Sequence, residues 1–114
     1  MYLSSTGFLM IGTTANNAVD RLQVNGSVLT TGLHVTAGTN TKTGSGTLTA
    51  GTVNIANTSI TANSKVFLQD TSSGALTNIG SLVVSSKTAG TGFTVKSTNV
   101  LDTSTFDYWV LETS

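Results

Sequence analysis

Near its end the chain reads Asp107-Tyr108-Trp109-Val110-Leu111, a short apolar segment bounded by polar and turn-forming residues. Runs of this length, rich in aromatic and β-branched side chains, are typical of β-strands. Three similar segments precede it and are separated from one another by polar, glycine-containing stretches: Lys65-Val66-Phe67-Leu68-Gln69, Ser81-Leu82-Val83-Val84-Ser85 and Phe93-Thr94-Val95-Lys96. Together the four segments predict a small antiparallel β-sandwich or barrel.

The composition also favours strands over helices. Ser and Thr make up about a third of the 114 residues, Gly contributes 12, and Pro is absent. Thr and Val side chains fit a pleated surface, whereas Ser, Asn and Gly favour turns. We therefore expect an all-β chain of short strands joined by tight turns. At most one helical turn is expected, at residues 16–22, where Asn16 or Asn17 would cap it.

The first half of the chain contains shorter pieces of the same alternating pattern. The dipeptide Asn25-Gly26 favours a type I′ turn and predicts a hairpin or a bend over residues 21–30. Residues 39–46 are polar and contain two glycines, so a flexible loop is expected there. The pieces that follow are expected to be short rungs and not long strands.

The chain is expected to have two parts, a β-rich shaft segment at residues 1–56 and an antiparallel β knob at residues 57–114. Five of the seven aromatic side chains fall in the second part. A globular part of about 60 residues buries only about 60% of its unfolded surface and is marginal alone. The shaft has exposed strand edges and few apolar residues. Symmetric self-association would supply the missing layers, so we expect a homo-oligomer, with an intertwined trimer preferred for a fibre-like shaft.

Charge and hydropathy exclude several classes of partner. Five basic residues balance five acidic ones, so no basic patch directs the chain onto nucleic acid. The apolar runs are far shorter than the roughly 20 residues of a spanning helix, so no membrane insertion is expected. The first residues have no cationic segment and no apolar core of signal-peptide length. An extracellular location would therefore be reached through particle assembly and lysis, or from a longer parent chain.

Candidate catalytic and metal-binding residues are few. His34 is the only histidine and is expected at a surface or an interface. Asp102 and Asp107 flank Thr103, but aspartates beside Ser and Thr more often form Asx turns than a glycosidase pair. The sequence lacks Cys, a G-x-S-x-G nucleophile motif and a phosphate-binding glycine motif. We expect no enzyme activity, no metal site and no cofactor.

The expected binding residues lie near the C-terminus. Tyr108 and Trp109 are adjacent in a strand and must point to opposite faces, so one belongs to the core and the other to an exposed surface or an interface. Exposed aromatic rings bind sugars by stacking, and polar side chains beside them supply hydrogen bonds. Tyr108, Trp109, Asp102 and Thr103 are therefore the candidate binding residues.

Five blocks of the sequence resemble segments of bacteriophage tail fibres and other virion structural proteins. Two blocks resemble a segment that recurs in fibre shafts: Gly7-Phe8-Leu9-Met10-Ile11-Gly12-Thr13-Thr14 and Arg21-Leu22-Gln23-Val24-Asn25-Gly26-Ser27-Val28. Three later blocks resemble a small β domain of phage structural and fibre proteins: Ile60-Thr61-Ala62-Asn63-Ser64-Lys65-Val66-Phe67-Leu68, Ala89-Gly90-Thr91-Gly92-Phe93-Thr94-Val95 and Asp102-Thr103-Ser104-Thr105-Phe106-Asp107-Tyr108-Trp109. Where family members commonly have a Pro after the first block, this chain has Ala15-Asn16-Asn17.

The resemblance implies a virion component with a trimeric shaft and a terminal β knob. One function that follows is a segment of a tail fibre or appendage whose knob contacts a glycan or protein of the host surface. The alternative is a capsid cement, decoration or head-fibre protein that stabilises the viral shell. Other virion proteins are expected partners in both cases. A polysaccharide-degrading tailspike would need clustered acids, whereas the five acidic residues of this chain are scattered.

Overall fold

The computed structural model describes residues 2–3, 9–11, 22–71 and 75–113, and these are almost entirely β-strand, turn and extended chain. The chain divides into two compact units, residues 1–33 and residues 34–114. The secondary structure of the described residues confirms the all-β class. Intertwining with other copies of the chain stays a prediction.

The first unit contains a small sheet with the order β1-β2-β3. Its strands are β1 (Tyr2–Leu3), β2 (Leu9–Ile11) and β3 (Leu22–Val24), with β1 antiparallel and β3 parallel to β2. The hairpin expected over residues 21–30 is wrong, because residues 27–30 form no strand after β3. A bend at Asn25-Gly26 replaces it, as the sequence also allowed. Most of the helical turn expected at residues 16–22 lies outside the described residues.

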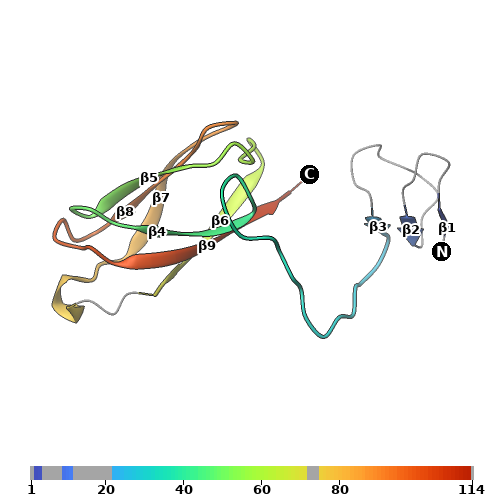
Figure 1. Cartoon of the computed structure of the whole chain (residues 1–114), viewed down its shortest axis with the longest axis horizontal. Helices are drawn as coiled ribbons and strands as arrows, with labels where there is room; N and C mark the ends of the chain where they lie inside the picture. Colours follow the sequence, from blue (N-terminus) through green and yellow to red (C-terminus); the bar gives the residue numbers. More distant parts are fainter. Residues whose placement is uncertain (1, 4–8, 12–21, 72–74, 114) are drawn as a thin grey trace. The chain divides into compact units, whose positions relative to one another are not determined.

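The second unit is built from two three-stranded antiparallel sheets, β4-β9-β6 and β5-β8-β7 (Figure 1). The four segments that sequence patterns identify as strands are confirmed as β6, β7, β8 and β9. A 3-10 turn, η1, precedes β7. The elements are β4 (Thr43–Thr47), β5 (Thr52–Ala56), β6 (Ser64–Asp70), η1 (Leu76–Asn78), β7 (Leu82–Thr88), β8 (Gly92–Ser97) and β9 (Thr105–Glu112).

The core of the second unit lies between the two sheets. In β9 the buried residues Phe106, Tyr108 and Val110 alternate with exposed ones, because strand side chains alternate between the inner and outer faces of a sheet. Phe93 of the central strand β8 meets Tyr108 of the central strand β9 in an edge-to-face contact, with ring centroids 5.1 Å apart. The buried apolar residues are Leu48, Ile60, Phe93, Val95, Phe106, Tyr108 and Val110.

Two glycines of β4 make room for the aromatic core. Gly44 lies opposite Tyr108 and Gly46 opposite Phe106 in the β4–β9 register. A Cβ atom at Gly44 would overlap the phenol of Tyr108, and one at Gly46 would overlap the ring of Phe106. The flexible loop expected at residues 39–46 is therefore wrong for its second half, which forms an edge strand over two large rings.

The boundary between the two units lies earlier in the chain than the sequence predicts. β4 pairs with β9, and β5 pairs with β8, so both strands complete the sheets of the second unit. The compact unit begins at His34, whereas the expected boundary follows residue 56. The difference arises because a three-stranded sheet needs both edge strands to cover its inner aromatic side chains.

Candidate functional site

The outer face of the β4-β9-β6 sheet carries an exposed aromatic pair. Trp109 of β9 lies directly opposite Phe67 of β6, and their ring centroids are 6.1 Å apart with an interplanar angle of 37°. The exposed fraction is 40% for Trp109 and 54% for Phe67. Leu111, two residues after Trp109, is also exposed. We call these three residues the aromatic face.

Polar side chains lie on both sides of this aromatic face. In the next cross-strand row, Asp107 of β9 lies between Ser45 of β4 and Gln69 of β6. The Ser45 hydroxyl donates a 2.7 Å hydrogen bond to Oδ1 of Asp107 and so fixes that carboxylate on the surface. Lys65 lies opposite Leu111 at the other end of the face. Apolar ring area is thus flanked by hydrogen-bonding groups.

The four predicted binding residues do not form one site. Trp109 is exposed, whereas Tyr108 is buried against Phe93, as the alternation of a strand requires. Asp102 is buried and its neighbour Thr103 is exposed. Of the four, Trp109 is the one that the structure places on a broad exposed face.

Asp102 holds the connection between β8 and β9 in place and is only 1% exposed. Oδ1 accepts hydrogen bonds from the backbone N–H and the hydroxyl of Ser104, and Oδ2 accepts from the N–H of Gly80 (2.9 Å) and the hydroxyl of Ser97 (2.6 Å). Burial by itself would raise the pKa of Asp102, but these donors hold the pKa well below its usual value. The bond to the Ser104 N–H forms the Asx turn that the sequence favours. The carboxylate is therefore structural.

Glu112 closes the end of β9 in a similar way. Its carboxylate accepts hydrogen bonds from Lys42 Nζ (2.7 Å), the Thr61 hydroxyl (2.5 Å) and the Ser64 hydroxyl. Partial burial opposes ionisation, but these donors and the positive charge of Lys42 lower the pKa of Glu112 to about 2. Lys42 Nζ also donates to the Ser59 carbonyl, so the residues just before β4, the turn before β6 and the end of β9 are tied together.

Among the described residues, no group of three or more His, Asp or Glu side chains is arranged to hold a metal ion. His34 is exposed. In the same part of the chain, no helix is long and apolar enough to cross a membrane.

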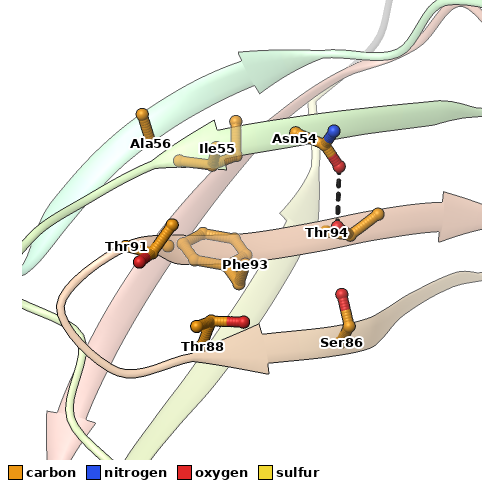
Figure 2. Close-up of a pocket in the computed structure, with 9 residues that line it drawn as sticks. Asn54, Ile55, Ala56, Ser86, Thr88, Thr91, Phe93 and Thr94 are labelled. Atoms are coloured by element: carbon orange, nitrogen blue, oxygen red, sulfur yellow. Dashed lines mark hydrogen bonds between the residues drawn. The ribbon is translucent and has the colours of Figure 1, made fainter.

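A shallow depression lies on the outer face of the other sheet, β5-β8-β7 (Figure 2). It has a volume of about 280 Å³. Its polar lining residues are Asn54, Ser86, Thr88, Thr91 and Thr94, and its floor includes Ala56 and Gly92. We call it the hydroxyl depression.

Comparison with protein families identifies the second unit. The family model described as the C-terminal domain of K1 capsule-specific polysaccharide lyase matches residues 40–111, well over half of the chain. The chain belongs to this family. Neither the comparison with curated proteins nor that with solved structures gives a match.

Membership of the K1 lyase C-terminal domain family makes this chain a phage tail-spike-related domain and implies a virion-associated protein. The matched residues include both sheets, the aromatic face and the hydroxyl depression. Sequence reasoning identified Trp109 but missed Phe67 as its neighbour. The alternation of β6 does place Phe67 on the same side as Lys65 and Gln69, but which strand pairs with β9 cannot be inferred from local pattern.

Proposed function

We propose that the chain is a non-enzymatic recognition module of a phage tail appendage, which binds a saccharide of the host surface through the aromatic face. The observation that carries this proposal is the pairing of Trp109 and Phe67 on an exposed sheet. The family favours a tail appendage over a capsid cement or head-fibre protein, because it is related to tail spikes.

The physical support lies in how pyranose rings are bound. The C–H faces of a sugar ring are apolar and pack against aromatic rings, while its hydroxyls need hydrogen-bonding partners at the edge. Trp109 and Phe67 offer two neighbouring rings, and Asp107 and Gln69 lie in the next row. The sheet fixes the backbone positions of all four, so little ordering would be required on binding.

The non-enzymatic part of the proposal rests on how three of the five acidic side chains are used. Asp102 is buried with four hydrogen bonds, and Glu112 is engaged by Lys42, Thr61 and Ser64. Asp107 accepts a hydrogen bond from Ser45 on an open face. Cleavage of a glycosidic bond by paired carboxylates requires two carboxyl groups flanking one bond in different environments. The lyase activity in the name of the family belongs to the enzyme from which that name is taken.

Self-association is also part of the proposal. Within the described part of the chain, residues 27–36 pair with no strand, and they expose Val28, Leu29 and Leu33 to solvent. Leu29 is fully exposed at 101%. Burial of such side chains between copies would gain about 25 cal/mol for each Å² of apolar surface. A trimer is the number that the resemblance to tail fibres favours, and other virion proteins would be the further partners.

The test is binding of the full chain to an array of purified host-surface polysaccharides. Trp109→Ala should weaken binding to the recognised saccharide by about tenfold or more, since aromatic anchors dominate such contacts. Val83→Ala is the matched control, because Val83 is an exposed apolar residue on the other sheet. Equal binding by both variants would refute the saccharide site. Release of reducing ends by the wild-type chain would refute the non-enzymatic assignment.

A further inference from the structure

The hydroxyl depression is formed by two cross-strand rows of side chains. In the first row Thr94 of β8 lies between Asn54 of β5 and Ser86 of β7. In the second row Gly92 lies between Ala56 and Thr88. The lining residues come from all three strands and from the turn before β8 (Figure 2): Asn54, Ile55 and Ala56 from β5, Ser86 and Thr88 from β7, Thr91 from the turn, and Gly92, Phe93 and Thr94 from β8.

Position 92, at the centre of the second row, must be glycine, so no side chain fills the depression there. Gly92 has a φ of +148°, and a Cβ atom at this position would overlap the carbonyl oxygen of Ile55. Ala56 beside it projects only a methyl group. The lowest part of the depression is therefore small and apolar, and it is bordered by the longer polar side chains of the first row.

A β-bulge selects which serine borders the depression. The β7–β8 register shifts between Val84 and Ser86, so that Ser86 and not Ser85 lies opposite Thr94. Such bulges commonly redirect a side chain beside a functional surface. On the opposite side, the Thr94 hydroxyl donates a 2.7 Å hydrogen bond to Oδ1 of Asn54. This bond orients the amide, and Figure 2 shows the Asn54 nitrogen pointing away from Thr94.

The lining chemistry is uncharged throughout. Four hydroxyls and one carboxamide border the depression, and no titratable side chain lines it. Hydroxyls donate and accept hydrogen bonds, which is the pattern that sugar hydroxyls also present. A charged ligand would therefore form no ion pair with the residues that line the depression. The volume of about 280 Å³ is slightly below the range of drug-sized ligand pockets, which starts at about 300 Å³, and therefore suits one ring.

We propose that the hydroxyl depression is a second binding site, which takes one uncharged hexose unit of a saccharide. The apolar face of the ring lies over Ala56 and Gly92, and its hydroxyls bond to Asn54, Ser86 and Thr88. This site is on the opposite sheet from the aromatic face and uses none of its residues. This proposal can therefore be confirmed or refuted independently of the proposed function.

The experiment is an NMR titration of the full chain with three neutral probes, maltohexaose, cellohexaose and mannohexaose, and one acidic probe, oligogalacturonate. The backbone N–H groups of Gly92 and Thr94 report on the depression, and the indole N–H of Trp109 reports on the aromatic face. We expect at least one neutral probe to give saturable shifts at Gly92 and Thr94. Trp109→Ala should leave those shifts unchanged.

Variants separate the site from a general surface effect. Asn54→Ala should weaken binding at the depression by about three- to tenfold, as loss of one hydrogen-bonding group implies, and Ala56→Leu should abolish binding by filling the floor. Thr52→Ala is the matched control, because Thr52 is exposed on the same strand and does not line the depression. The proposal is overturned if no neutral probe saturates these shifts, if the acidic probe binds there more tightly, or if Thr52→Ala weakens binding as much as Asn54→Ala.

Discussion

Replacement of Asp102 by Asn is the sharpest test of how the second unit is held together. The change keeps the shape of the side chain but turns one oxygen into an amide nitrogen, which donates and cannot accept. Each carboxylate oxygen of Asp102 accepts two hydrogen bonds, from Ser104 at one and from Gly80 and Ser97 at the other. Whichever oxygen is replaced, two donors lose their acceptor and at least one N–H faces the new NH₂ group.

The expected decrease in the free energy of unfolding follows from the loss of those two hydrogen bonds. Hydrogen bonds to a charged group contribute about 1.5–3 kcal/mol each, and Asp102 is almost fully buried, so water cannot replace them. Reorientation of the Ser97 or Ser104 hydroxyl recovers part of the loss. We expect Asp102→Asn to lower the free energy of unfolding by about 2–5 kcal/mol, a large share of the about 5–15 kcal/mol of an ordinary domain.

Urea-induced unfolding of the wild-type chain and the variant, followed by tryptophan fluorescence, measures this difference. Asp107→Asn is the matched control, because Asp107 is an exposed aspartate with a hydrogen bond from Ser45, and it should cost less than about 1 kcal/mol. If Asp102→Asn unfolds at the same urea concentration as Asp107→Asn, the buried network does not carry the stability assigned to it.

The same network sets the direction of the pH dependence. The folded-state pKa of Asp102 lies below its unfolded value, so the folded state binds fewer protons than the unfolded state in acid. The stabilisation is complete above the unfolded pKa of about 3.9 and is lost as the pH falls toward the folded pKa. Unfolding curves recorded from neutral pH into acid should therefore show falling stability for the wild-type chain. The fall should be smaller for Asp102→Asn, although Glu112 keeps a part of it.

Three further substitutions test the core, the edge strand and the self-association. Phe93→Ala should lower the free energy of unfolding by about 3–5 kcal/mol in urea titrations, because the ring is buried against Tyr108, and Leu82→Ala, at a half-buried site, should cost less. Gly44→Ala should lower the thermal midpoint, because a Cβ atom there overlaps the phenol of Tyr108; an unchanged midpoint would contradict the packing described for β4. Leu29→Ser should shift the species seen by light scattering toward monomer, and a wild-type chain that is already monomeric at micromolar concentration would refute the proposed assembly.

The strands that could be predicted from the sequence are those whose inward positions hold large apolar side chains. In β9 the residues Phe106, Tyr108 and Val110 recur at every second position, which is typical of a strand with one buried face. β4 has the opposite character, since its inward positions are Gly44 and Gly46. Its contribution to the fold is space for the rings of β9, and a local pattern cannot reveal that. The early boundary of the compact unit was missed for the same reason.

The candidate site was predictable only in part. The alternation of β9 identifies one of Tyr108 and Trp109 as exposed, but the choice between them depends on which face of β9 meets β8. The partnership of Trp109 with Phe67 depends on the register between β6 and β9, which is set by packing over the whole sandwich. The hydroxyl depression depends on a bulge at Ser86 and on the conformation of Gly92, and neither has a distinctive local sequence.

Each outer face of the sandwich would bind a single sugar ring weakly, and binding by several copies at once would compensate for this. The aromatic face is open, and the hydroxyl depression is shallow, so neither encloses a ligand, and a single sugar ring bound at either would dissociate quickly. A polysaccharide, however, presents the same unit many times. If the copies associate through residues 27–36 as proposed, each copy adds its two faces, and simultaneous binding of several units raises the overall affinity by about a hundredfold or more without any new contact. Affinity for the polymer would then come from the number of associated copies, which explains both the exposed apolar side chains before the sandwich and the weak sites on it. A Leu29→Ser chain should therefore retain binding to a single oligosaccharide but lose most of its binding to the polymer.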